Sequence, residues 1–188
     1  MHINSFNNMS FTGQYVASGK VKTNDLLFPT EDVSIVELNP NDKNDFNVFK
    51  KIKKDWRWAT LSSIMLDDAV QMRKCPEDAE VFKFYVVTTQ KDNFENINPD
   101  KVLAEAEISH EDYDNKLWIE YLQVRPDCKY GLPDRPFKKV GSAFLDFCKE
   151  HFKGKNLVVC PLEESIDFYD NEGFNAHSSG VGTMSYQA

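Results

Sequence analysis

The strand-to-helix junction between residues 116 and 151 constrains the fold more than any other part of the chain. The segment "KLWIEYLQV", 116–124, is rich in the aliphatic and aromatic residues of a strand. From Val140 the apolar residues recur with the i, i+3, i+4 and i+7 spacing of a helix that packs on a sheet. Gly141 lies in its first turn, where backbone N–H groups lack helical partners and a missing Cβ permits close approach. The junction therefore predicts a phosphate-binding helix start. The alternative is that Gly141 only allows the helix and the sheet to pack closely.

The charge distribution favours a small polyanionic ligand at this junction. The formal net charge of the chain is −8, which disfavours a nucleic-acid partner because phosphate contacts need a basic face. Residues 125–139 are an exception to the acidic background. Their basic residues are Arg125, Lys129, Arg135, Lys138 and Lys139. A solvated loop without a ligand is the alternative reading of this charge run.

Length and composition indicate one globular domain. With 188 residues and 41% hydrophobic content, the chain is long enough to bury a core of its own. Residues 1–30 are rich in Asn, Ser, Thr and Gly without a sustained period, so we expect a polar N-terminal extension at 1–30 and a domain at 31–188. Because neither a secretory leader nor a membrane-length apolar window is apparent, we expect a soluble, cytoplasmic protein without a membrane partner.

The cysteines are scattered along the chain without a CxxC pair. They are Cys75, Cys128, Cys148 and Cys160. This spacing predicts free thiols in a reducing compartment, with neither disulfides nor a metal site.

Hydrophobic periodicity predicts an α/β domain with the order β-α-α-β-β-β-α-β-α-β-β. Gly173 is expected to end the last helix, because glycine is the residue that most often follows a helix C-terminus. The expected strands are 33–38, 81–89, 102–109, 116–124 and 156–160, with two more within 173–187, and the expected helices are 46–52, 61–72, 140–151 and 163–171.

The element order and three motifs together resemble the GNAT superfamily of acyl-CoA-dependent N-acyltransferases. The motifs are "YLQVRPD", "KKVGSA" and "SIDFYDNEGF", and the resemblance covers residues 31–188. It implies a mixed, mostly antiparallel sheet flanked by helices. It also implies an N-acetyltransferase that moves an acetyl group from acetyl-CoA to a primary amine by direct attack in a ternary complex. A non-catalytic acyl-CoA sensor or interaction module on the same fold is the alternative.

The resemblance also implies which residues hold the cofactor. The family's phosphate loop follows [Q/R]-x-x-G-x-[G/A], and this chain departs from it by a lysine in the first place. The matching residues are Lys138, Lys139, Val140, Gly141, Ser142 and Ala143. The strand before the loop would offer the backbone groups of Leu122 and Val124 to the pantetheine arm. The segment before Lys138 is longer than usual in the family, and a flap over the cofactor is one expectation for it.

Two side chains are candidates for acid and base catalysis. Glu120 has the same strand parity as Leu122 and Val124, so we expect it on the cofactor face, where a carboxylate suits the deprotonation of an amine. The resemblance implies that Tyr169 protonates the departing thiolate, as a phenol can. An exposed glutamate and a core tyrosine are the alternatives.

The acceptor site is expected near Trp56 and Trp58, between the first two helices, with His177 in the last hairpin. Ring faces beside Arg57 suit an aliphatic or cationic amine, whereas helix packing is the other reading of the two tryptophans. The acidic composition favours a cationic acceptor, either a small molecule such as a polyamine or an amino sugar, or a lysine side chain.

Overall fold

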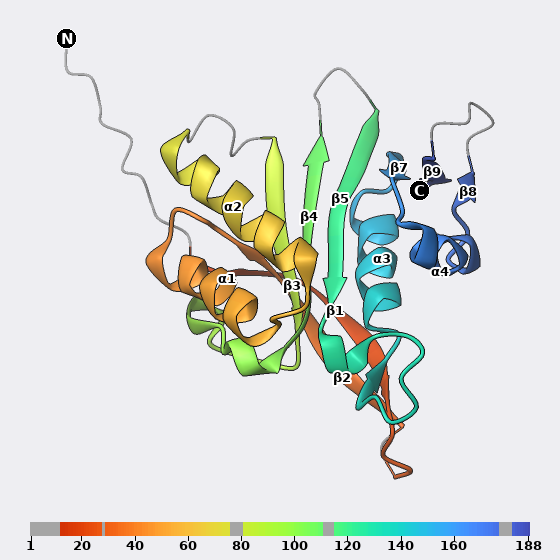
Figure 1. The fold of residues 1–188 in the computed structure, drawn as a ribbon, viewed down its shortest axis with the longest axis horizontal. Coiled ribbons are helices and arrows are strands. Elements are labelled where there is room, and N and C mark those ends of the chain that lie inside the picture. Colours follow the sequence, from red (N-terminus) through yellow and green to blue (C-terminus); the bar gives the residue numbers. More distant parts are fainter. Residues whose placement is uncertain (1–11, 28, 76–80, 111–114, 177–181) are drawn as a thin grey trace.

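The computed structural model describes residues 12–27, 29–75, 81–110, 115–176 and 182–188. Within them one nine-stranded sheet has the order β6-β1-β2-β3-β4-β5-β7-β9-β8, with α1 and α2 on one side and α3 and α4 on the other (Figure 1). The strands are β1 Gln14–Thr23, β2 Thr30–Leu38, β3 Phe82–Thr88, β4 Val102–His110, β5 Lys116–Val124, β6 Phe137–Lys138, β7 Asn156–Val159, β8 Asn175–Ala176 and β9 Met184–Gln187. The α-helices are α1 Lys43–Asp55, α2 Thr60–Lys74, α3 Val140–His151 and α4 Ile166–Asn171.

The sheet is mixed and mostly antiparallel, which confirms the expected fold class. Neighbouring strands in the described part of the chain pair antiparallel, except β5 and β7, which are parallel. A parallel neighbour needs a crossover connection, and α3 lies on that crossover. The helix is therefore held against the sheet between β5 and β7, after the connecting segment 125–139.

The N-terminal boundary differs from the expectation of an extension over residues 1–30. Strand β1 pairs with β2 from Gln14 opposite Glu37 to Lys22 opposite Thr30, so residues 14–23 belong to the sheet. Most side chains of β1 are exposed or half-buried, and only Val21 is fully buried. A strand with so few buried residues has the polar composition of a loop, which explains why the sequence pattern does not reveal it.

Asp45 anchors the start of β1 to α1. Its carboxylate is fully buried and accepts a hydrogen bond from the Gly13 N–H at 3.1 Å and another from the Asn39 N–H at 2.8 Å. Burial raises the pKa of Asp45 to about 6, although the two backbone hydrogen bonds oppose that shift. The first strand is thus tied to the helical layer through a buried side chain.

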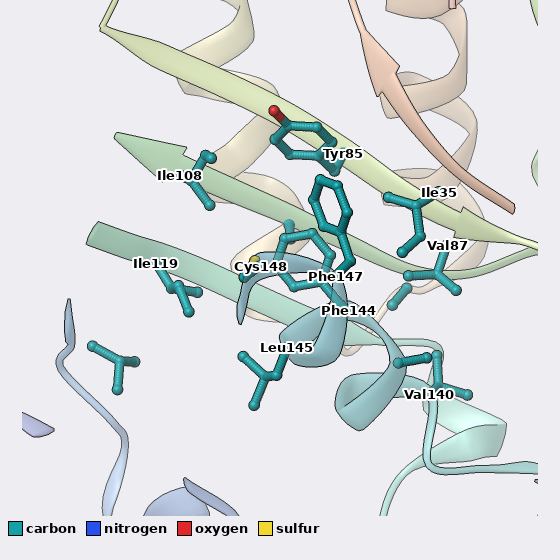
Figure 2. Close-up of a cluster of buried hydrophobic side chains, with 14 of the residues drawn as sticks. Ile35, Tyr85, Val87, Ile108, Ile119, Val140, Phe144, Leu145, Phe147 and Cys148 are labelled. Carbon is teal, nitrogen blue, oxygen red and sulfur yellow. The ribbon is translucent and has the colours of Figure 1, made fainter. Parts of the chain in front are cut away.

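Two apolar clusters pack on opposite faces of the sheet. Figure 2 shows the first, in which Val140, Phe144 and Phe147 of α3 lie against the sheet strands. The second lies under α1 and α2 and includes Phe49 and Met65. Strand β5 contributes side chains to both clusters, so both of its faces are covered by packed residues. A ligand can therefore reach β5 only where no neighbouring strand pairs with it.

Candidate active site

Strand β5 outruns its neighbour β7 and leaves a gap in the sheet. The two strands pair only from Lys116 opposite Asn156 to Ile119 opposite Val159. Residues 120–124 continue β5 for five more positions beside α3, below the end of β7 in Figure 1. The backbone of this half of β5 therefore has a partner strand, β4, on one side only.

The backbone groups of Leu122 and Val124 point toward that gap. The Arg125 N–H donates to the Leu103 carbonyl at 2.8 Å, so Arg125 turns its backbone toward β4. In an antiparallel ladder successive residues alternate in the direction of their N–H and C=O groups. Leu122 and Val124 consequently direct theirs away from β4, although the Val124 carbonyl also accepts a bond from the Gln123 side chain at 2.9 Å.

A β-bulge overturns the parity argument for Glu120. Ile119 pairs with Ile108 and Tyr121 pairs with Glu107, which leaves Glu120 as an extra residue in β5. An extra residue reverses the alternation of side chains beyond it. Glu120 accordingly lies on the α2 side of the sheet and accepts a hydrogen bond from the Ser109 hydroxyl, whereas Leu122 and Val124 pack on the α3 side.

The start of α3 presents free backbone N–H groups. No side chain caps this helix, and its N-cap Lys139 adopts a left-handed conformation with φ of 62°. The Ala143 N–H donates to the Lys139 carbonyl at 3.0 Å. This N–H is therefore used within the helix, although Ala143 was expected in the phosphate loop. The N–H groups of Val140, Gly141 and Ser142 precede the first helical bond.

Gly141 faces the helix α4, not the open end of α3. A Cβ built on Gly141 would lie 2.9 Å from Cζ of Phe168. The glycine therefore allows α3 to pack closely on α4, whereas the alternative weighed from the sequence was close packing on the sheet. The Ser142 hydroxyl is also committed to α4, since it donates to Glu172 at 2.6 Å. Only the backbone of this turn is free to contact a ligand.

The segment between β5 and α3 is tied to the edge of the sheet. Arg125 contacts Asp127 at 2.7 Å and donates to the carbonyl of Asp100, and residues 137–138 pair with β1. This pairing fixes only the end of the segment, and the flap over the cofactor stays a prediction. The other basic residues of this segment form no ion pair within the described part of the chain: Lys129, Arg135, Lys138 and Lys139.

Tyr169 lies in the α3-side cluster, in ring contact with Phe168 and Phe174. Burial raises the pKa of its phenol well above the ordinary value, so the group holds its proton at neutral pH. The turn after it is as expected from the sequence: Gly173 has φ of +87° and the Phe174 N–H donates to the Tyr169 carbonyl at 3.0 Å.

A pocket lined with carboxylates opens between α2 and the sheet. Its volume is about 310 Å³. The lining residues are Asp68, Gln71, Met72, Phe82, Glu107, Glu120 and Tyr121. Glu120 and Tyr121 border both the pocket and the unpaired half of β5, because they sit at the bulge. The pocket and the gap are therefore neighbours on one strand.

Glu107 is a buried pocket carboxyl group that sequence reasoning missed. It is only 1% exposed, and burial, together with the charges of Asp68 and Glu120, raises its pKa to about 8. Its neighbour Glu105 is equally buried outside the pocket, and burial raises its pKa to about 7. The alternating "AEAEIS" of β4 was the available signal, because it places both glutamates on one face of the strand.

The structure separates the expected acceptor residues from this pocket. Trp56 is buried in the α1–α2 core, and Trp58 is 92% exposed. Neither lines the pocket, which borders the C-terminal half of α2. His177 lies outside the described residues.

Among the described helices none is long and apolar enough to cross a membrane. The described His, Cys, Asp and Glu residues do not gather into a group that could hold a metal ion, and all four cysteines are free thiols.

The sheet is open and mixed, and it parts between the bulged strand β5 and its parallel neighbour β7. The start of α3, with its uncapped N–H groups, follows β5 in the chain. This arrangement is the fold of the GNAT N-acyltransferases. Solved structures share it at low identity. A protein from Desulfovibrio desulfuricans described as a GNAT-family acetyltransferase matches with a TM-score of 0.50 and 13% identity, over 81% of this chain and 94% of the other.

Two more solved structures are similar to this degree. The PaiA N-acetyltransferase of Thermoplasma acidophilum, in complex with coenzyme A, matches with a TM-score of 0.52 and 13% identity, over 83% of this chain and 99% of the other. AtaT, complexed with acetyl-methionyl-tRNAfMet, matches with a TM-score of 0.50 and 13% identity, over 83% and 95%. No family model and no curated sequence matches the chain. The similarity at this level is one of fold.

Proposed function

We propose that this protein is an N-acetyltransferase that uses acetyl-CoA and a primary amine. One observation carries the proposal: the unpaired half of β5 meets the free start of α3 at one end and the carboxylate pocket at the other. A thioester cofactor and an amine need adjoining sites of these two kinds. Fold similarity alone would not support the activity, because one fold can carry many functions.

The residues of the gap suit an acyl-CoA. Backbone N–H groups of Val140, Gly141 and Ser142 at a helix N-terminus favour a pyrophosphate, and the helix dipole adds to the attraction. Lys138 and Lys139 adjoin them, and neither forms an ion pair with a described residue. The outward backbone groups of Leu122 and Val124 would pair with the amide-bearing pantetheine arm.

The two proposed catalytic groups lie on opposite faces of the sheet. Acetyl-CoA supplies the acetyl group as a thioester, and the acceptor nitrogen gains a C–N bond to that group as its C–S bond breaks. Glu120, held by Ser109 on the α2 side, accepts the proton that the attacking nitrogen loses. Tyr169, on the α3 side, donates its phenolic proton to the departing sulfur and regains one from solvent. An outward N–H of β5 stabilises negative charge on the carbonyl oxygen.

The test combines binding with turnover. CoA should raise the melting temperature of the protein, because a ligand that binds only the folded state stabilises it. Glu120→Gln should lower the rate of amine acetylation by about 100-fold or more, most strongly at low pH, where the amine is hardest to deprotonate.

Glu150→Gln is the matched control, because Glu150 lies exposed on α3 away from the pocket. An unchanged pH–rate profile in Glu120→Gln would show that another group, or solvent, is the general base. Stabilisation by CoA without acetylation of any amine would instead favour the non-catalytic acyl-CoA module.

A further inference from the structure

The carboxylate pocket holds more acidic side chains than the proposed reaction uses. Glu120 is assigned to the reacting nitrogen, which must be neutral when it attacks. Asp68 and Glu107 line the same pocket and have no assigned part in the transfer. The lining residues include no lysine, arginine or histidine in the described part of the chain.

Glu107 is an unsatisfied buried acceptor. Its Oε2 has no hydrogen-bond partner among the described residues, and the side chain is 99% buried while still lining the pocket. A buried carboxylate oxygen without a partner is costly, so native proteins seldom leave one without a role. A donor brought by a ligand would satisfy it.

Two basic side chains on the surrounding elements make their contacts elsewhere. Arg73 of α2 donates to the Pro40 carbonyl at 2.8 Å and lies over the Phe46 ring. Lys83 of β3 forms an ion pair with Glu37 at 3.0 Å. Neither of these cations compensates the pocket carboxylates.

The rest of the lining selects the shape of the ligand. Met72, Phe82 and Tyr121 supply the apolar part of the lining, and the volume of about 310 Å³ admits a small molecule. Apolar walls suit a chain of methylene groups, and the carboxylates suit cations at its ends. An extended aliphatic molecule with separated positive charges satisfies both requirements.

We propose that the acceptor is a linear aliphatic diamine or polyamine, with one amine presented to Glu120 and a second ammonium group bound by Glu107 and Asp68. This inference rests on the proposed function for the identity of the reacting amine. The second-cation subsite itself stands on the pocket geometry and is measurable by binding alone.

Binding of the second ammonium group should depend on pH. Glu107 is mostly protonated at neutral pH in the empty pocket, since burial and two nearby carboxylates raise its pKa to about 8. The groups that face it are Asp68 from α2 and Glu120 and Tyr121 from β5, while β3 contributes the apolar Phe82. An ammonium group favours the carboxylate form, so binding should release a proton and tighten as pH rises from about 6 to 8.

The experiment compares two amines of equal length. The ratio of kcat/KM for 1,4-diaminobutane to that for butylamine is measured with acetyl-CoA in the wild type, Glu107→Gln and Asp68→Asn. Wild type should prefer the diamine by about 10-fold or more, the effect of one charge-assisted hydrogen bond, and each variant should lose most of that preference. Glu105→Gln is the control and should keep it, because Glu105 is a buried glutamate of the same strand outside the pocket.

Calorimetry of the CoA-loaded protein with each amine separates this proposal from the proposed function. If no amine is acetylated, diamine binding that is lost in Glu107→Gln and releases a proton still supports the subsite, whereas no diamine binding overturns it. If acetylation occurs, equal use of both amines by the wild type overturns it. An equal loss of kcat for both amines in Glu107→Gln also overturns it, because Glu107 would then act at the reacting nitrogen.

Discussion

Replacing Gly141 by alanine tests whether helix packing, and not ligand contact, requires the glycine. The added Cβ would lie 2.9 Å from Phe168 Cζ, whereas carbon atoms pack best at about 3.5–4.0 Å. The ring must therefore retreat by roughly 1 Å. Such overpacking costs about 1–3 kcal/mol, and the higher helix propensity of alanine offsets about 1 kcal/mol of it. We expect a net loss of about 1 kcal/mol, or about 2–4 °C in melting temperature for a chain of this size.

A double-mutant cycle isolates the contact. Leucine at position 168 lacks the ring atoms that approach Gly141, so Phe168→Leu should relieve the strain of Gly141→Ala. Thermal unfolding of the wild type, both single variants and the double variant gives the coupling free energy, which should be about 1 kcal/mol in favour of the double variant. Additive effects, or a melting temperature that Gly141→Ala leaves unchanged, would refute the packing argument.

The same variants test the ligand side of the argument. Because the new methyl group points at α4, Gly141→Ala should keep the rise in melting temperature that CoA produces. A variant with normal stability and no response to CoA would show that the glycine is needed for ligand approach after all.

Two further changes have defined outcomes. Tyr169→Phe should lower acetyl transfer by about 100-fold or more while leaving the dissociation constant of CoA nearly unchanged, because the phenol acts mainly in the transition state; wild-type turnover would remove its acid role. For Glu105, burial raises the folded-state pKa to about 7, so the unfolded chain ionises first as pH rises and the wild type loses stability between about pH 5 and 7. Urea unfolding at pH 5 and 8 should show Glu105→Gln gaining up to about 3 kcal/mol relative to the wild type over that interval, and a constant difference would contradict the pKa shift.

Local patterns were enough to predict most of the elements. Strand 116–124 and helix 140–151 have the bounds read from the sequence, and Gly173 ends the last helix in a left-handed conformation. Period, capping and the conformational freedom of glycine act within a few residues, so they are legible in the chain itself. The motifs that resemble the GNAT superfamily are local in the same sense, and they led to the correct fold.

The placement of the site residues depended on partners distant in the sequence. The face on which Glu120 lies follows from a bulge, and a bulge exists only as a mismatch between the residues of β5 and those of β4. Gly141 meets Phe168 only after α4 packs against α3, and β1 is recognisable as a strand only through its pairing with β2. The carboxyl groups of the pocket come together where α2 covers β4 and β5, and burial there raises the pKa of Glu107. The sequence by itself determined which elements form, whereas the pairing and packing of those elements decided which side chains share a site.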